Sequence, residues 1–204
     1  MTLANMTVLA DAAAARRREM PVAIALVLLT GGIAAAVLGG AGPVAWAAVM
    51  VVLFILDTEL YRRLDTVDAQ LTQTASLGVA VWAFFCSTFY VALPIALWAQ
   101  GQAAGAVAAM VLWVVGVVRQ FDPGLSGSLA VAIAGAAPPA LSLMGAPLWF
   151  AAHSPQPDWD LAVIAVAGGG ALTAYVMRAR LRAQLGPRAA REEVQHRQPR
   201  AKPA

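Results

Sequence analysis

Six apolar stretches dominate this chain and leave little room for anything else. They cover residues 21–39, 44–61, 75–99, 103–118, 127–152 and 161–177. A helix needs ~20 apolar residues to cross the ~30 Å hydrocarbon core of a bilayer, and each stretch meets or approaches that length. Sixty per cent of the residues are hydrophobic and only 12% are charged. We therefore expect an all-α integral membrane protein, a bundle of six transmembrane helices.

The basic residues predict how this bundle is oriented. All 14 lysines and arginines fall in segments that are separated by an even number of spans. The other connections, residues 40–43, 100–102 and 153–160, contain no lysine or arginine. Because basic loops stay in the cytoplasm, we expect both termini inside, in a multi-pass protein of the bacterial inner membrane. The residues that set this topology are Arg16, Arg17, Arg18, Arg62, Arg63, Arg119, Arg178, Arg180 and Arg182.

Tryptophan positions agree with this orientation. Amphipathic rings collect at the level of the lipid headgroups, and four tryptophans fall at the predicted outer ends of spans. They are Trp46, Trp98, Trp149 and Trp159. Trp82 and Trp113 lie deeper, and we interpret both as packing residues.

The chain divides into three parts. Residues 1–20 form an Ala-rich amphipathic lead-in that ends in three arginines, predicted to be a short interfacial helix. Residues 21–177 form the six-helix membrane domain. Residues 178–204 continue the last helix until Gly186 and Pro187 break it, and the polar, basic tail after them is expected to be disordered.

Two acidic residues lie inside the second span. Asp57 is roughly 20 Å from the start of that span, at 1.5 Å per residue, and an intramembrane carboxylate is a candidate functional group. We expect only the Tyr61 phenol as its partner, and little effect of Asp57→Asn on folding. Glu59 precedes Arg62 and Arg63 by one helical turn, so we expect it to pair with them at the interface.

The third and fifth spans carry the remaining candidate functional residues. Tyr90 belongs to a modest polar stripe in the third span, and Pro138 with Pro139 should kink or break the fifth span. Ser142 is a candidate partner for the carbonyl groups that the prolines free. The resulting bundle has room for a small cavity between these two spans. In the sixth span we expect replacement of Gly169 by a bulky residue to disturb helix packing.

Enzymatic motifs are not convincing. Residues 124–127 match the GxSG pattern of rhomboid proteases, but the last span has no histidine to act as base. Ser126 is better interpreted as the N-cap of the fifth span. His153, Asp158 and Asp160 form only a loose set of metal ligands in one loop. We therefore expect no enzyme, no cofactor and no nucleic-acid partner, and the bilayer itself as the main partner.

The chain resembles the amino-terminal six-helix membrane module of sensor histidine kinases, often hybrid kinases, of alphaproteobacteria. The resemblance rests on three features over residues 10–182: the arginine-rich lead-in, residues 59–63 (Glu-Leu-Tyr-Arg-Arg), and the aromatic third span from Trp82 to Trp98. It implies an input module of a two-component system that signals through its last helix. The implied partners are a cytoplasmic kinase or a second copy of the chain. The kinase motifs themselves are absent from these residues, so the chain would be a sensor module alone, whether truncated, stand-alone or a fragment.

Two other functions stay open. The first is a small transporter or channel for an ion or solute that uses Asp57 and the kinked fifth span. The second is a structural membrane protein without catalytic activity. Flux of an ion or solute across liposome membranes that is abolished by Asp57→Asn would distinguish the transporter from the other functions.

Overall fold

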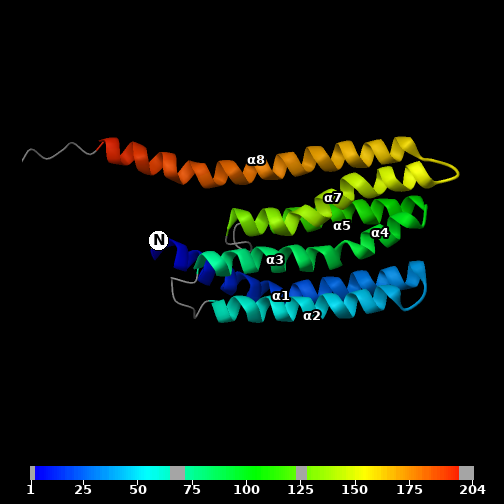
Figure 1. The fold of residues 1–204 in the computed structure, drawn as a ribbon, viewed down its shortest axis with the longest axis horizontal. Helices are drawn as coiled ribbons and strands as arrows, with labels where there is room; N and C mark the ends of the chain where they lie inside the picture. Colours follow the sequence, from blue (N-terminus) through cyan, green and yellow to red (C-terminus); the bar gives the residue numbers. More distant parts are fainter. Residues whose placement is uncertain (1–2, 65–71, 123–127, 198–204) are drawn as a thin grey trace, which may run out of the picture.

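The protein is an antiparallel bundle of helices whose long axes lie side by side (Figure 1). The computed structural model describes the backbone of residues 3–64, 72–122 and 128–197, and side chains within 14–63, 77–122 and 128–179. In chain order the helices are α1 (Leu3–Leu38), α2 (Gly42–Leu64), α3 (Thr72–Tyr90), α4 (Ala92–Ala99), α5 (Ala103–Gln120), α7 (Leu129–His153) and α8 (Trp159–Arg197). Within these described residues, six segments are long and apolar enough to cross a membrane, and α3 with α4 supplies one of them, Leu77–Ala99. The expected six-span helical bundle is confirmed at this level.

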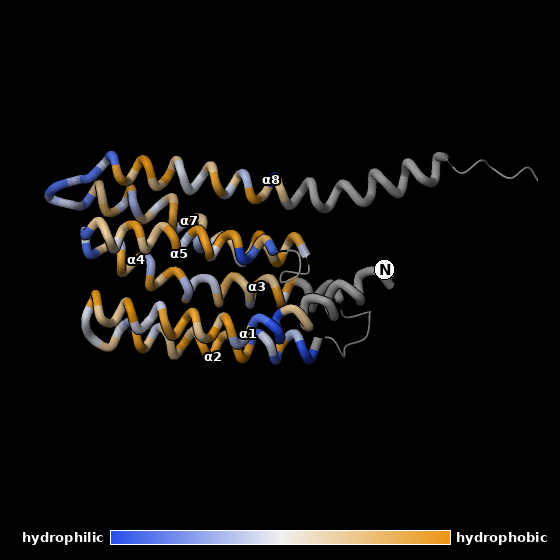
Figure 2. The backbone as a smooth tube through the Cα atoms, turned by 180° about the vertical axis from the view of Figure 1, so that it is seen from behind, coloured by the Kyte–Doolittle hydropathy of each residue, from blue (hydrophilic) through white to orange (hydrophobic). Residues whose placement is uncertain are grey.

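The two ends of the bundle differ in chemistry. Arg16, Arg62 and Arg119 lie near the end where α1, α3 and α7 begin and where α2 and α5 terminate; we call this the arginine end. The opposite end, the loop end, holds short turns in which Gly39, Gly40 and Gly101 adopt positive φ angles. Only glycine takes this conformation without steric cost. Apolar residues run along the helices between the two ends, and hydrophilic residues gather toward them (Figure 2).

The lead-in and the first span form one helix. We predicted a separate interfacial helix over residues 1–20, but α1 runs without interruption from Leu3 to Leu38 and contains Pro21. Proline removes one backbone hydrogen bond, and the Ala-rich sequence on both sides continues the helix. As a result, Arg16 lies within Ala14–Leu38, a stretch long and apolar enough to span a membrane.

The third span, by contrast, is divided. We predicted one helix over residues 75–99, and the structure instead has a break at Val91 between α3 and α4. Pro94 has no N–H to donate to the carbonyl of Tyr90, four residues earlier. Hydrogen bonds from Val91 N to Ser87 O (3.2 Å) and from Ile95 N to Val91 O (3.1 Å) carry the chain across the break.

Two helix ends also differ from expectation. The N-cap of α7 is Ser128, whose hydroxyl accepts a hydrogen bond from Val131 N at 3.2 Å; the predicted cap, Ser126, lies outside the described residues. Helix α8 does not stop at Gly186 and Pro187 but continues to Arg197. Alanine, arginine, glutamine and glutamate dominate this stretch, and all four are strong helix formers.

The helices pack as two units. Helix α1 packs along α2, and this pair is the α1–α2 hairpin. Helix α7 lies at the centre of the other unit and packs against α3, α5 and α8, while α4 packs against α5. We call this second unit the α3–α8 body. The hairpin meets the body mainly along α3.

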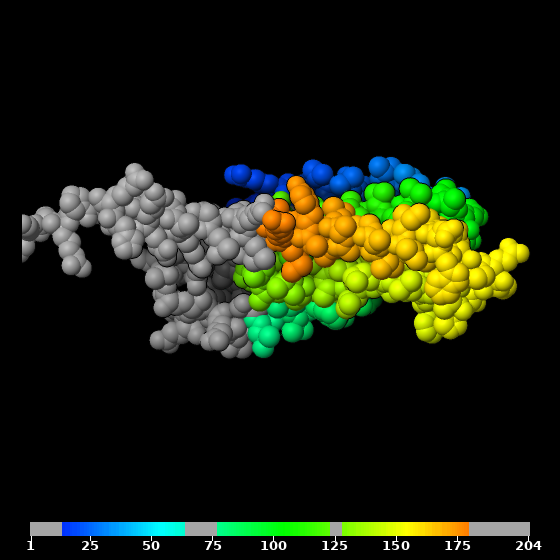
Figure 3. Space-filling model, turned by 90° about the horizontal axis from the view of Figure 1, so that it is seen from above, coloured from blue at the N-terminus to red at the C-terminus, as the bar shows by residue number. Residues whose placement is uncertain are grey.

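Large apolar side chains cover the outside of the bundle, as expected for contact with lipid tails. Leu29 of α1, Leu77 of α3 and Ile164 of α8 are each at least 60% exposed. Helix α8 lies open on one face, as Figure 3 shows in orange. The interior is closely packed around Trp113, which is fully buried.

Candidate functional site

Asp57 is held by two side chains from neighbouring helices. Arg16 of α1 forms an ion pair with one carboxylate oxygen. Trp82 of α3 donates a hydrogen bond of 3.1 Å from its indole Nε1 to the other oxygen. The side chains of Arg16 and Asp57 are only 14% and 16% exposed. Tyr61, the partner expected from sequence, does not bind this carboxylate in the described structure, so that expectation was wrong.

Tyr61 instead supports the arginine. The guanidinium of Arg16 lies over the Tyr61 ring, 4.0 Å from its centroid, which is the geometry of a cation–π contact. The Tyr61 ring is 2% exposed, and its hydroxyl has no hydrogen-bond partner among the described residues. The ring therefore contributes to the site through its face rather than through its hydroxyl.

A second arginine lies close to this group. Arg119, in the last turn of α5, places its guanidinium 4.7 Å from the centroid of the Phe54 ring of α2. Next to it, Gln120 donates a hydrogen bond of 3.3 Å to the hydroxyl of Ser87 in α3. The arginine end of the interior thus carries two guanidinium groups and two neutral polar side chains around one carboxylate.

Aromatic residues join the helices nearer the loop end. The Tyr90 hydroxyl of α3 donates to the carbonyl of Leu112 in α5 at 2.7 Å. Trp46 of α2 donates its indole N–H to the carbonyl of Phe89 at 3.1 Å, and its ring lies 6.2 Å from that of Tyr90. One of these bonds joins α2 to α3 and the other joins α3 to α5.

Many of these residues line a cavity of about 300 Å³. Its walls come from α1, α2, α3 and α5, with Pro139 of α7 as a further lining residue. Arg16, Asp57, Ser87, Arg119 and Gln120 line its arginine end. We call this space the seam cavity, because it lies where the α1–α2 hairpin meets the α3–α8 body. The sequence predicted a small cavity between the third span (α3 with α4) and the fifth span (α7). The seam cavity contacts both of these spans, and α1, α2 and α5 form most of the rest of its wall.

The paired prolines have different surroundings from those predicted. Pro138 and Pro139 are both buried, and α7 continues through them as a helix that bends near its middle (Figure 1). Within the described residues Ser142 makes no hydrogen bond to the carbonyls that the prolines free. Pro139 lines the seam cavity and also packs against Gly116 of α5. A Cβ atom built on Gly116 would lie only 3.2 Å from the Cβ atom of Pro139. The prolines therefore shape the wall of the cavity.

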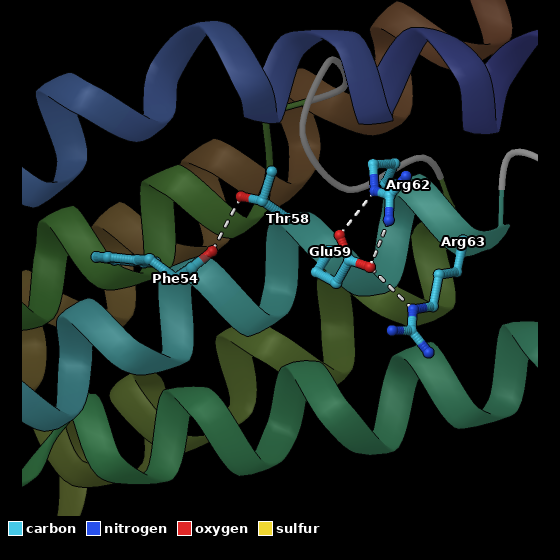
Figure 4. A network of polar contacts seen from close by, with 5 residues as sticks. All are labelled: Phe54, Thr58, Glu59, Arg62 and Arg63. Carbon is cyan, nitrogen blue, oxygen red and sulfur yellow. Dashed lines mark hydrogen bonds and ion pairs between the residues drawn. The ribbon is translucent and has the colours of Figure 1, made fainter.

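Glu59 pairs locally, as predicted. Arg62 donates two hydrogen bonds of 2.7 Å to its carboxylate, and Arg63 donates one of 2.9 Å (Figure 4). All three side chains lie toward solvent at the end of α2. Thr58, beside them, donates to the carbonyl of Phe54 at 2.9 Å. Glu59 belongs to this surface network and not to the seam cavity.

The predicted topology residues share one end of the bundle. Arg17, Arg18 and Arg178 are exposed there, as are Arg62 and Arg63, whereas Arg16 and Arg119 are half-buried and line the seam cavity. The side chains of Arg180 and Arg182 lie outside the described residues. Two of the arginines that we assigned to topology alone are therefore part of the candidate site.

The loop between α7 and α8 does not assemble a metal site. Among the described residues, no three His, Cys, Asp or Glu side chains come together as metal ligands. His153 stacks on Trp149 with ring centroids 4.0 Å apart. Asp158 accepts a hydrogen bond of 3.0 Å from Leu161 N, which starts α8. These contacts give both residues a structural role.

Sequence reasoning missed the two residues that define the site, Arg16 and Trp82. Both residues bind Asp57, but they are 41 and 25 positions away from it in the sequence, so spacing within one helix could not connect them. The sequence did contain one signal for Arg16. An arginine just before an apolar stretch can lie inside the membrane span when the helix begins several residues before that stretch.

Comparison with models of known protein families, with curated proteins and with solved structures gives no match.

Proposed function

We propose that this protein is a non-catalytic sensory module of the bacterial inner membrane, in which occupancy of the seam cavity moves α8. The arginine end would face the cytoplasm, following the preference of basic segments for that side. The output would pass to a cytoplasmic kinase or to a second copy of the chain, in keeping with the resemblance to histidine-kinase input modules.

One observation carries the proposal: a chain of contacts leads from the cavity wall to α8. Pro139 lines the cavity. Leu143, one turn further along the same face of α7, is 2% exposed and fills the space beside Gly169 of α8. A Cβ atom built on Gly169 would overlap the Leu143 side chain. A shift of α7 at Pro139 would therefore press directly on α8.

The position of the cavity supports the same function. It separates the α1–α2 hairpin from the α3–α8 body, and two relatively rigid units with a ligand site between them can move against each other. Helix α8 extends as an unbroken helix beyond the bundle at the arginine end. A small rotation or shift within the membrane would be carried along that helix.

Filling the cavity with a side chain tests the proposal without knowledge of the ligand. Ala83 lines the cavity and is 8% exposed, so Ala83→Phe places a ring in it. Spin labels on Leu56→Cys in α2 and Tyr175→Cys in α8, in a Cys86→Ser background, report the distance between the two units. Leu56 and Tyr175 are 47% and 70% exposed, which makes them suitable labelling sites.

We expect Ala83→Phe to change this distance by about 1–2 Å, the usual size of helix shifts in switching proteins. Val81→Phe is the matched control, since Val81 lies on the outer face of the same helix and is 62% exposed. An unchanged distance in a folded Ala83→Phe variant would reject the sensory proposal.

A transporter that uses Asp57 is the second candidate, because this carboxylate faces a cavity in the membrane interior. The apolar wall above the arginine end, which includes Val27, Met50 and Leu53, argues against a path for polar solutes. Proton flux into liposomes, measured with an internal pH-sensitive dye, separates the two functions. Flux that requires Asp57 would favour transport.

A further inference from the structure

We infer that the seam cavity binds an anionic amphiphile with an acyl chain, which enters from the bilayer between α1 and α5. The inference rests on the proposed function, because it takes the seam cavity as the sensory site and names the class of its ligand. Three features of the cavity carry it: the charge at one end, the length of the apolar wall, and the position of the opening.

The arginine end of the cavity has an excess of positive charge. Two guanidinium groups, on Arg16 and Arg119, face the single carboxylate of Asp57. Asp57 is the ion-pair partner of Arg16. Arg119 stacks on Phe54, and no carboxylate of the described residues lies within ion-pair distance of it. Glu19 and Asp57 both attract Arg119 electrostatically over a longer distance. Glu19 is exposed and does not line the cavity, and Asp57 is already paired with Arg16.

A charge that is largely buried among protein side chains is costly unless it is paired. The half-buried Arg119 therefore favours an anionic group beside it, and guanidinium binds carboxylate and phosphate oxygens through paired hydrogen bonds. Ser87 and Gln120 add neutral polar groups at the same level. The headgroup that fits here carries a carboxylate or a phosphate.

The rest of the cavity is long and apolar. On α1 its lining runs from Arg16 to Thr30, a rise of roughly 21 Å at 1.5 Å per residue. The α1 side chains that line the cavity between these two, Ala23, Leu26 and Val27, are apolar. The side chains that α2 and α5 contribute at the same height, including Met50 and Leu112, are apolar as well. The charged end of this space fits an anionic headgroup, and its apolar length fits the extended acyl chain attached to that headgroup.

The opening of the cavity faces lipid. Leu26 of α1 and Val115 of α5 line the cavity and are at the same time 57% and 50% exposed. Helices α1 and α5 make almost no contact with each other, and we place the opening between these two residues. At this depth the surrounding medium is hydrocarbon. A ligand that reaches the cavity there comes from the membrane, with its charged group at the interface.

Tryptophan quenching tests the inference directly. Trp46 lines the cavity, so bromine atoms on a bound acyl chain should quench its fluorescence. The probe is dibromostearate, added to the full chain in phosphatidylcholine nanodiscs at a pH where its carboxylate is ionised. The methyl ester of dibromostearate is the neutral control, and Trp46→Phe identifies the part of the signal that comes from the cavity.

We expect saturable quenching of Trp46 by the acid and only weak, non-saturable quenching by the ester. Arg119→Gln should weaken the apparent affinity about tenfold or more, the usual effect of losing a hydrogen bond to a charged group, whereas Arg119→Lys should recover part of it. Arg178→Gln removes the same charge from the same end of the bundle outside the cavity, and should change nothing. If Arg119→Gln does not fold, Val115→Phe at the exposed mouth should slow or prevent quenching.

Two further samples identify the source of the amphiphile. Nanodiscs of brominated phosphatidylglycerol, compared with brominated phosphatidylcholine, test whether an anionic phospholipid places a chain in the cavity. Quenching by either the fatty acid or phosphatidylglycerol supports the inference. Equal quenching by acid and ester, with no preference for phosphatidylglycerol, would overturn it. Binding without movement of α8 would leave the inference intact and reject the sensory function, so the two failures are distinguishable.

Discussion

Trp82 of α3 donates a hydrogen bond of 3.1 Å from its indole nitrogen to the carboxylate of Asp57 in α2. This bond joins the α1–α2 hairpin to the α3–α8 body at the arginine end of the seam cavity. Arg16 binds the same carboxylate from α1. Three helices therefore meet at one charged group.

Asp57→Ala should destabilise the protein, whereas Glu59→Ala should not. Removing the Asp57 carboxylate leaves Arg16 and the Trp82 indole without this partner in a mostly buried site. We expect a loss of about 2 kcal/mol, less than the ~3–5 kcal/mol of a fully buried pair, because both side chains keep some exposure. This revises the sequence-based expectation that Asp57 matters little for folding. Thermal unfolding in detergent provides the measurement.

Glu59 is the matched control for that experiment. It lies two residues further along α2, and its partners are the exposed side chains of Arg62 and Arg63. Exposed ion pairs contribute little to stability, so the melting temperature of Glu59→Ala should equal that of the wild type. Adding Arg16→Ala to Asp57→Ala should restore part of the lost stability. Strictly additive losses would contradict the ion pair.

Tyr61→Phe should be tolerated and Tyr61→Leu should not. The Tyr61 hydroxyl is buried and makes no hydrogen bond of good geometry among the described residues, so we expect its removal to cost little. The ring carries the contact with Arg16, and loss of the aromatic face should cost about 1–2 kcal/mol. Equal melting temperatures for the two variants would show that the cation–π contact is unimportant.

Gly169→Leu should disrupt the packing of α8 against α7. Leu143 occupies the space that a side chain at position 169 would need, whereas a Cβ atom at Gly168 meets nothing within 4 Å. We expect Gly169→Leu to cost about 1–3 kcal/mol from overpacking and Gly168→Leu to cost far less. Denaturation of the purified variants measures both. Adding Leu143→Ala to Gly169→Leu should rescue stability, and no rescue would count against this contact.

The orientation of the bundle is open to a labelling experiment. We expect cysteines at Arg178 and at Arg63 to react with a membrane-impermeant maleimide only in inverted vesicles, and a cysteine at Ser154 to react only in spheroplasts. The Cys86→Ser background removes the one natural thiol. Basic segments on the cytoplasmic side predict this pattern. Labelling of position 178 in spheroplasts would reverse the assigned topology.

Local features of the sequence predicted the fold well. Apolar length located the spans, and helical spacing predicted the pairing of Glu59 with Arg62 and Arg63. Interactions within one helical turn depend on spacing alone, so they can be seen without a structure. The break at Val91 was missed, although Pro94 was there to indicate it, because proline in a membrane helix is often accommodated without a break.

The candidate site was harder to predict, for a physical reason. Asp57 could be recognised as a costly group in the membrane, but its partners Arg16 and Trp82 come from other helices, and helix rotation decides which side chains meet. Arg16 was assigned to topology because the lead-in was expected to be a separate helix. The continuity of α1 through Pro21 places Arg16 in the span, next to Asp57.

The most direct test of the account is the distance between spin labels at positions 56 and 175, recorded with the seam cavity empty and then with stearate at a concentration that saturates Trp46 quenching. We predict a shift of about 1–2 Å that Arg119→Gln reduces at the same stearate concentration. An identical distance in both states, with stearate shown to be bound, would contradict the claim that occupancy of the cavity moves α8.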